Sequence, residues 1–386
     1  MPALDVEAHT TARARWAVSS IFFVNGFVFA SWVPHIPGVK ARHALSDASL
    51  GLVLLAMAVG AVLALTLAGG LVGRLGSKRV TSAAALGFCL LLPLPIWLGG
   101  VMPLALSLVC FGALNATLDV AMNAQAVAIE RRHGGSIMSS FHGLFSLGGL
   151  IGAGLAGLCL AAGLSSRQHV VLIAIGSALW VWSRLPALLD TPVGNGAPPV
   201  FVKPTNVLLG LGALAFAGLL VEGAMADWTA VYLRDTLLSS PARASLGFAA
   251  FSLTMAAGRF AGDRVVNRLG AGAVLRYSGW IAAAGLGGAV VLHDAVAAII
   301  GFALVGLGTS NIIPILFSAA GRVQRADTAA SLAAVATTGY LGFLVGPPLI
   351  GFVAQWAGMS MAIGLLAILC VFIALCARTL TVPDVR

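Results

Sequence analysis

Long apolar runs separated by short polar breaks form the main pattern of this chain. A helix needs roughly 20 mostly apolar residues to cross the hydrocarbon core of a bilayer. Only short polar segments remain between the runs, so the pattern predicts a polytopic, all-α membrane protein. We expect twelve spans, at about 15–38, 48–72, 80–98, 102–129, 137–163, 168–188, 206–233, 244–267, 272–292, 295–320, 328–355 and 358–379.

Composition supports a membrane location. Hydrophobic residues make up 59% of the chain and charged residues 9%, and the mean hydropathy is +1.00. A soluble domain normally carries about a quarter charged residues. The chain therefore has too little polar surface for a soluble globule.

Charge is distributed according to membrane topology. The net charge of +9 comes from 22 Lys and Arg residues against 13 Asp and Glu residues. If the chain begins in the cytoplasm, most of the basic residues fall in cytoplasmic loops, as the positive-inside rule requires. We therefore expect both termini in the cytoplasm, and we read the basic excess as a topology signal rather than as nucleic-acid binding.

Cofactor and metal signatures are not found in the sequence. The 5 cysteines all fall in apolar spans, without ligand spacing, which predicts neither a disulfide nor a metal site. Gly152, Gly154 and Gly157 spell a dinucleotide fingerprint, but no strand precedes them. With Gly148 and Gly149 they instead predict close helix packing.

Two loops repeat each other in the two halves of the chain. GGLVGRLGSKRV follows the second span and GDRVVNRLGAGAV follows the eighth, and aligning RLG places Gly76 against Gly270. We therefore expect six-helix bundles at 1–189 and 206–386, joined by a cytoplasmic linker at 190–205 that is rich in Pro and Gly. Parallel halves of this kind hold a binding site between them at mid-membrane.

The first of these loops resembles the signature G-x-x-x-D-R-x-G-R-K-R of the major facilitator superfamily. Gly73 stands where the signature has its acid, and Ser77 replaces a base, so the usual ion-pair latch is in doubt here. The stretches FHGLFSLGGLIG, AAGRFAGD, VATTGYLGFLVGPPLIGF and ASWVPHIP look like bacterial inner-membrane facilitators of the YbjJ type, and more distantly like the fucose–proton symporter group. The residues that fit the signature are Gly69, Arg74, Gly76, Lys78 and Arg79.

This resemblance implies a secondary transporter with two pseudo-symmetric six-helix bundles in a bacterial inner membrane. Such a protein works as a monomer by alternating access. The resemblance covers nearly the whole chain, and it specifies the fold more closely than the substrate.

The fourth span carries polar residues in NATLDVAMN. Asn115, Asp119 and Asn123 are four residues apart and share one helix face. An acid at the centre of a span costs roughly 2.5–3.5 kcal/mol on insertion scales, so this face should point to the interior. Asp119 is a candidate proton carrier, and Asn115 and Asn123 are candidate substrate ligands; the alternative is a structural contact between helices. In the fucose–proton symporter group an acid is followed by Asn at the same spacing.

The seventh span carries two more acids, Glu222 and Asp227, which are about 140° apart around the helix. We expect Glu222 to bind substrate or a cation and Asp227 to contact a neighbouring helix or an outer gate, although the reverse assignment is open. Both are candidates for proton coupling. Trp228 either stacks on a sugar ring or anchors at the membrane interface.

Four other polar residues within spans are further candidates, and three of them have two readings. Asn25 either packs or donates to substrate, and Asn311 either bonds backbone groups freed by Pro314 or contacts substrate. His142 is either a proton relay, because its unperturbed pKa is near 6.5, or a neutral histidine bonded to the fourth span. Tyr340 is a candidate for lining the cavity.

Basic residues at the cytoplasmic ends are candidate gates. Arg259 is the one base within a span, and its spacing to Asp263 predicts an ion pair at the cytoplasmic gate, with Arg264 and Arg268 nearby; the alternative is snorkelling to the headgroups. Arg74 in the first signature loop is a further candidate. Ion pairs that form in one state only would bias which way the cavity opens.

These features predict a secondary active transporter of a small polar or amphipathic solute. Its expected partners are that solute, protons rather than sodium, and the bilayer, with no cofactor and no enzymatic activity. The first span lacks the acid that fucose–proton symporters carry there, so efflux by antiport remains an alternative. A non-transporting membrane sensor and a membrane-embedded enzyme are the alternatives from other classes.

Overall fold

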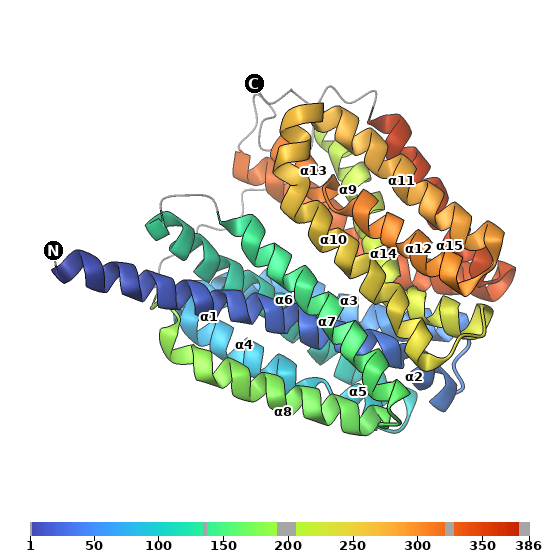
Figure 1. Cartoon of the computed structure of the whole chain (residues 1–386), viewed down its shortest axis with the longest axis horizontal. Coiled ribbons are helices and arrows are strands. Elements are labelled where there is room, and N and C mark those ends of the chain that lie inside the picture. Colours follow the sequence, from blue (N-terminus) through green and yellow to red (C-terminus); the bar gives the residue numbers. More distant parts are fainter. Residues whose placement is uncertain (1, 134–136, 191–205, 321–327, 378–386) are drawn as a thin grey trace. The chain divides into compact units, whose positions relative to one another are not determined.

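The computed structural model describes residues 2–133, 137–190, 206–320 and 328–377. All regular secondary structure in these residues is helical (Figure 1). The helices group into two compact units, one made of Met1–His35 and Ala56–Ala197 and the other of Ile36–Leu55 and Pro198–Arg386. Residues 191–205, which make up nearly all of the expected linker, lie outside the described residues, and the expected bundle boundaries stay a prediction.

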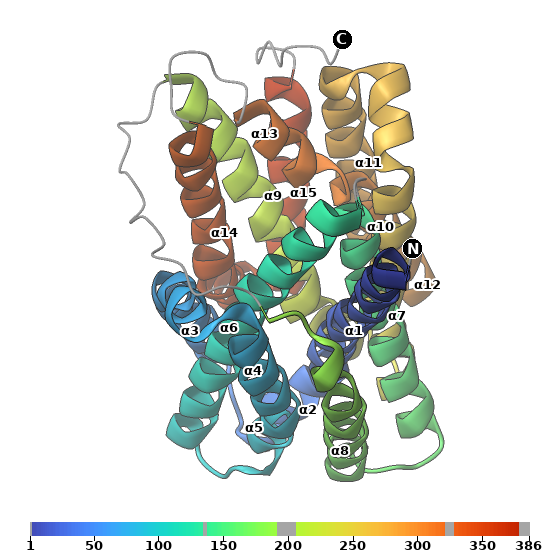
Figure 2. The same ribbon diagram turned by 90° about the vertical axis from the view of Figure 1, so that its left-hand side faces the viewer.

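The first unit contains the helices of the amino-terminal half. Its elements are α1 (Pro2–Trp32), η1 (Val33–His35), the inner part of α3 (Asp47–Leu75), α4 (Ser77–Leu91), α5 (Leu94–Trp97), α6 (Val101–His133), α7 (Met138–Ala161), α8 (Ser166–Arg184) and η2 (Leu185–Ala187). Helix α1 packs along α7, and α4 packs along α6 and α8 (Figure 2).

The second unit contains the helices of the carboxy-terminal half and one short segment of the amino-terminal half. Its elements are α2 (Ile36–Arg42), the start of α3, α9 (Asn206–Val231), η3 (Tyr232–Thr236), α10 (Pro241–Leu269), α11 (Ala271–Leu292), α12 (Ala295–Thr309), α13 (Ile312–Ala320), α14 (Thr328–Ala357) and α15 (Met359–Cys376). Helix α9 packs against α14, α10, α13 and α15, and α11 packs against α12 and α15.

Eleven helical segments of the described residues are long and apolar enough to cross a membrane. The remaining expected span corresponds to helix α10, which is 29 residues long. Its inner half carries Arg259, Asp263, Arg264 and Arg268, which lower its hydropathy. The length and position of α10 fit the eighth expected span, so each of the twelve expected spans contains helix among the described residues, with breaks at 92–93 and 310–311.

Close helix packing in the first unit depends on glycine. A Cβ atom added to Gly148 would overlap the carbonyl oxygen of Phe23, and one added to Gly152 would overlap that of Phe27. Helices α1 and α7 can therefore approach this closely only because these positions have no side chain. A Cβ atom added to Gly154 would meet nothing within 4 Å, so Gly154 takes no part in this interface.

Candidate functional site

The acid in the fourth span is hydrogen-bonded as the spacing predicts. The amide nitrogen of Asn123 donates to Oδ1 of Asp119 at 3.1 Å and to the backbone carbonyl of Asp119 at 2.8 Å. Asp119 lies 18 residues into α6, so it is about 27 Å from the start of this helix at 1.5 Å per residue. The structure thus places a carboxyl group with an amide donor near the middle of α6.

The polar face of α6 formed by Asn115, Asp119 and Asn123 is only partly covered by neighbouring helices. Asn115, Asp119 and Asn123 are half-buried, whereas Leu118 and Met122 on the adjoining face are 1% exposed. Oδ1 of Asn115 is buried and has no hydrogen-bond partner among the described residues. This polar face therefore has a hydrogen-bond acceptor, Oδ1 of Asn115, that no described residue uses.

Glu130 ends the same helix face and has a structural role. Its Oε2 accepts hydrogen bonds from the backbone N–H groups of Ile137 and Met138, each at 2.8 Å. These two residues begin α7, and a carboxylate there satisfies N–H groups that the helix itself leaves unpaired. Glu130 therefore ties the inner ends of α6 and α7 together.

Two candidates on other helices of the first unit contact neighbouring side chains. The amide nitrogen of Asn25 on α1 points to Sδ of Met122 at 3.7 Å, and Oδ1 of Asn25 is buried without a partner in the described part of the chain. The ring of His142 on α7 meets Phe22 edge-on, with 5.3 Å between ring centroids. Asn25 is 1% exposed, so this conformation does not present it to a solute.

Glu222 in the seventh span forms an ion pair that the sequence did not predict. Nη2 of Arg259 on α10 lies 3.2 Å from Oε1 of Glu222 on α9. The expected pair of Arg259 with Asp263 is not formed, because Asp263 is exposed and the guanidinium group extends across to α9 instead. Arg259 therefore contacts a neighbouring helix at mid-span and does not snorkel away from it.

Asp227 and Trp228 are both buried. Asp227 is 5% exposed, and no hydrogen bond or ion pair joins it to another described residue. Trp228 is 0% exposed, and its Nε1 is buried without a partner among the described residues. Trp228 therefore lies inside its unit and not at a lipid-facing interface, and its proposed stacking on a solute stays a prediction.

The remaining candidates divide into packed and exposed groups. Asn311 donates to the carbonyl of Gly258 on α10 at 3.1 Å and to Oγ of Ser310 at 3.0 Å, so it ties the α12–α13 break to a neighbouring helix. Tyr340 packs beside Phe343, with 6.2 Å between ring centroids. The expected gate residues Arg74, Asp263, Arg264 and Arg268 are exposed and form no ion pair with any described residue.

A buried histidine pair joins η1 to α8, and the sequence did not predict this contact. Nε2 of His35 lies 2.9 Å from Nδ1 of His169, and the two side chains are 2% and 0% exposed. One of the two nitrogens must carry the shared hydrogen, so each ring depends on the other. His169, at the start of α8, had no motif in the sequence to distinguish it.

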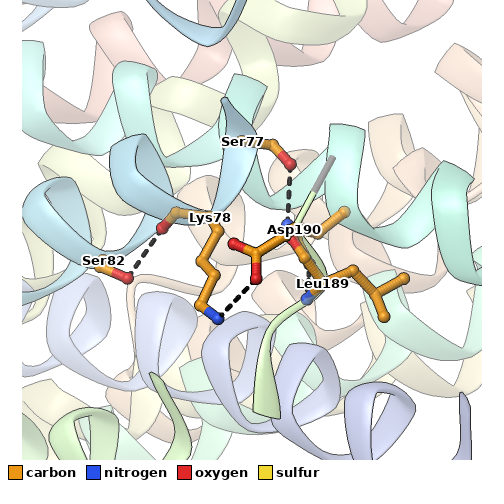
Figure 3. Close-up of polar contacts among 6 residues, drawn as sticks. Ser77, Lys78, Ser82, Leu189 and Asp190 are labelled. Atoms are coloured by element: carbon orange, nitrogen blue, oxygen red, sulfur yellow. Dashed lines mark hydrogen bonds and ion pairs between the residues drawn. The ribbon is translucent and has the colours of Figure 1, made fainter. Parts of the chain in front are cut away.

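Gln125 is a second polar group that sequence reasoning missed. Its Nε2 donates to Oγ of Ser77 and to the carbonyl of Leu189, each at 2.7 Å, and its Oε1 accepts from the N–H of Leu189 at 3.0 Å. Lys78 beside it pairs with Asp190 at 3.2 Å. Figure 3 shows Ser77, Lys78, Leu189 and Asp190 gathered at this point. The signature loop thus binds the end of the first six-helix half.

A metal site is not found in the described residues. No group of three or more His, Cys, Asp or Glu side chains there could hold a metal ion. The titratable groups within the spans instead occur singly or in pairs.

Comparisons with known proteins agree with this architecture. The family model of the Major Facilitator Superfamily matches residues 210–386. An uncharacterized MFS-type transporter of Yersinia pestis is 41% identical over 93% of this chain and 94% of its own length. Membrane protein MosC of Rhizobium meliloti is 37% identical over 92% of this chain and 88% of its own length. The crystal structure of a D-xylose-proton symporter is 14% identical, covers 94% of this chain and 97% of that one, and has a TM-score of 0.73.

Proposed function

The chain belongs to the major facilitator superfamily, and from this premise we propose that it moves a small polar or amphipathic solute by proton-coupled alternating access. It is a multi-pass membrane transporter with an all-helical fold, as the sequence predicted. What we add to this is the coupling ion, the class of solute and the residues that take part.

Asp119 carries the proposal of proton coupling. It lies near the middle of α6, it is half-buried, and Asn123 donates a hydrogen bond to its carboxylate. Burial disfavours the charged form of a carboxyl group, while the amide donor favours it. A carboxyl group that is both partly buried and hydrogen-bonded can gain or lose a proton when water reaches it from one side of the membrane and not from the other.

Other titratable groups have environments that suit them less well to this role. Glu222 is paired with Arg259, so its charge is already balanced within the protein. Asp227 is buried, and it could serve only after a conformational change exposes it. We therefore rank Asp119 first, with Glu222, Asp227 and His142 as secondary candidates.

We further propose that the protein lies in a bacterial inner membrane with both termini in the cytoplasm. The positive-inside rule supports this orientation. In this orientation, Gln125, Lys78 and Asp190 lie on the cytoplasmic side, as does the proposed linker between the bundles 1–189 and 206–386.

The test of coupling uses purified protein in proteoliposomes. A thermal-shift screen first identifies a solute, because a ligand that binds only the folded state raises the apparent stability. We expect Asp119→Asn to abolish solute-linked proton movement while solute exchange persists. Asp294→Asn is the matched control, because Asp294 is an acid at a helix start between two spans. Unchanged proton movement in Asp119→Asn removes Asp119 from the role.

Efflux by proton antiport is the second candidate, and one observation favours it. Residues 16–42, which include the first span, contain no Asp or Glu, whereas the resemblance to fucose–proton symporters implies an acid there. Imposing a pH gradient in each direction distinguishes the two modes. Solute that accumulates on the acidic side indicates antiport, and solute that accumulates on the alkaline side indicates symport.

A further inference from the structure

Glu222 and Arg259 form an ion pair between two neighbouring helices, α9 and α10. Glu222 is 16 residues from the start of α9, which places it about 24 Å along that helix. Arg259 lies 10 residues before the end of α10, and burying an ion pair in a membrane is unfavourable unless good geometry and further hydrogen bonds compensate. The 3.2 Å contact is longer than the 2.7–2.9 Å typical of strong charge-assisted hydrogen bonds.

The pair is partly exposed on a part of α9 that is otherwise buried. The side chains of Glu222 and Arg259 are 22% and 18% exposed. On a lipid-facing surface the residues three and four positions away would be exposed too, but 217–221 and 224–231 of α9 are all buried. The exposure at Glu222 and Gly223 is thus confined to this level of α9, where a small molecule could reach the two charged side chains.

Aromatic side chains of α14 lie beside the same position. A Cβ atom on Gly223 would lie 2.7 Å from Cδ1 of Phe343, so this ring reaches α9 next to Glu222. Phe343 is half-buried and packs beside Tyr340. A ligand at this position therefore meets a guanidinium group, a carboxylate and two aromatic rings.

We propose that Arg259 is an anion subsite and that the transported solute is a small organic acid, whose carboxylate replaces Glu222 as the partner of Arg259. This inference rests on the proposed transport function and specifies its substrate class. The planar guanidinium group matches a carboxylate with two parallel hydrogen bonds, whereas Glu222 makes one contact at 3.2 Å. The aromatic pair then packs on the apolar or ring part of the solute.

Glu222 acts in this arrangement as a competitor for Arg259. In the empty site it balances the charge of Arg259, so the cation is never left alone in the membrane. An entering carboxylate must displace it, which lowers the affinity for the anion. Removing the charge of Glu222 should therefore strengthen anion binding, a result that a purely structural ion pair would not give.

The test measures thermal stabilisation of the full chain in detergent by matched probes at constant ionic strength. The probes are benzoate against benzamide and D-glucuronate against D-glucose. We expect the two acids to raise the Tm of the wild type and the two neutral compounds to have little effect. In Glu222→Gln the acids should act at concentrations lower by about tenfold, since hydrogen bonds to charged groups are worth about that factor or more.

The double variant Glu222→Gln/Arg259→Gln controls for folding, because it leaves neither charge without its partner. It should fold and lose the response to both acids. A response that persists in the double variant, or neutral probes that act as strongly as the acids, would overturn the inference.

Binding in Asp119→Asn separates this inference from the proposed coupling. An acid response that is retained in Asp119→Asn supports the anion subsite even if proton movement proves unaffected by that substitution. Proton-linked transport of a neutral solute, together with no acid response, refutes the subsite alone and leaves the proposed function standing.

Discussion

The ammonium group of Lys40 lies 2.7 Å from Oδ2 of Asp235, which is 195 positions later in the chain. Asp47 lies at the same distance from the same nitrogen through its Oδ1. One cation therefore joins α2, the start of α3 and η3, all within the second unit. This cluster explains why Ile36–Leu55 groups with helices of the other half of the chain.

We predict that Lys40→Met destabilises the protein more than Asp235→Asn does. Removing Lys40 leaves two neighbouring carboxylates without a cation, whereas removing the charge of Asp235 leaves Lys40 paired with Asp47. Asp235 is 38% exposed, so Asp235→Asn should cost less than about 1 kcal/mol. Thermal unfolding in detergent at low and high salt measures both effects, which should shrink with salt.

Arg167→Gln is the control for this comparison. Arg167 is an exposed base at the start of α8 with no ion pair among the described residues. Its loss should leave the Tm unchanged. Equal Tm values for Lys40→Met and Arg167→Gln would show that the cluster contributes nothing.

Glycine packing between α1 and α7 gives a second prediction. Gly152→Ala places a Cβ atom against the carbonyl oxygen of Phe27, whereas Gly154→Ala meets no atom within 4 Å. Overpacking of this kind typically costs about 1–3 kcal/mol, so Gly152→Ala should lower the Tm clearly. Gly154→Ala should have the wild-type Tm or a slightly higher one, because Ala favours the helix. Similar Tm values for the two variants would contradict the packing account.

Sequence reasoning could predict the helices and the local pairs. Lipid offers no hydrogen bonds to the backbone, so apolar runs of sufficient length must be helices. The contact of Asn123 with Asp119 followed from a spacing of four residues on one helix, and the structure shows it. The close packing of Gly148 and Gly152 was predicted in the same way from small residues on one helix.

Contacts between distant positions could not be predicted from spacing. Arg259 had an acid four residues away, and it pairs instead with Glu222, 37 positions away. His35 binds His169, which is 134 positions away. No local rule distinguishes such partners, because they depend on which helix faces meet after the chain has folded.

The histidine pair gives a third prediction. In His169→Leu, the ring of His35 stays buried and loses its hydrogen-bond partner, since Nε2 of His35 bonds Nδ1 of His169. Leaving a buried polar group unpaired costs about 1–3 kcal/mol. The double variant His35→Leu/His169→Leu should recover part of this loss, because it leaves no unpaired ring. Exposed His133 provides the control substitution, His133→Leu. A double variant less stable than the sum of the single variants would argue against a bonded pair.

Gln125 gives the last prediction, which concerns the point where the signature loop meets the end of the first half. Gln125 is 0% exposed and hydrogen-bonds other segments three times, twice to the backbone of Leu189. Gln125→Leu fits the space but leaves the N–H and the carbonyl of Leu189 without these partners. We expect a loss of about 2 kcal/mol or more, since each unsatisfied buried group costs about 1–3 kcal/mol.

Gln125→Glu separates hydrogen bonding from volume. A carboxylate can still accept from the N–H of Leu189, but it cannot donate to the Leu189 carbonyl or to Ser77. We therefore expect Gln125→Glu to be destabilised at neutral pH even though its shape is nearly that of Gln. Gln355→Leu is the matched control, because Gln355 is exposed near the end of α14 and such surface substitutions usually stay within about 0.5 kcal/mol. If Gln125→Leu and Gln355→Leu have similar Tm values in thermal unfolding, the hydrogen bonds of Gln125 do not hold the end of the first half in place. In that case the contact of Lys78 with Asp190 must do so alone.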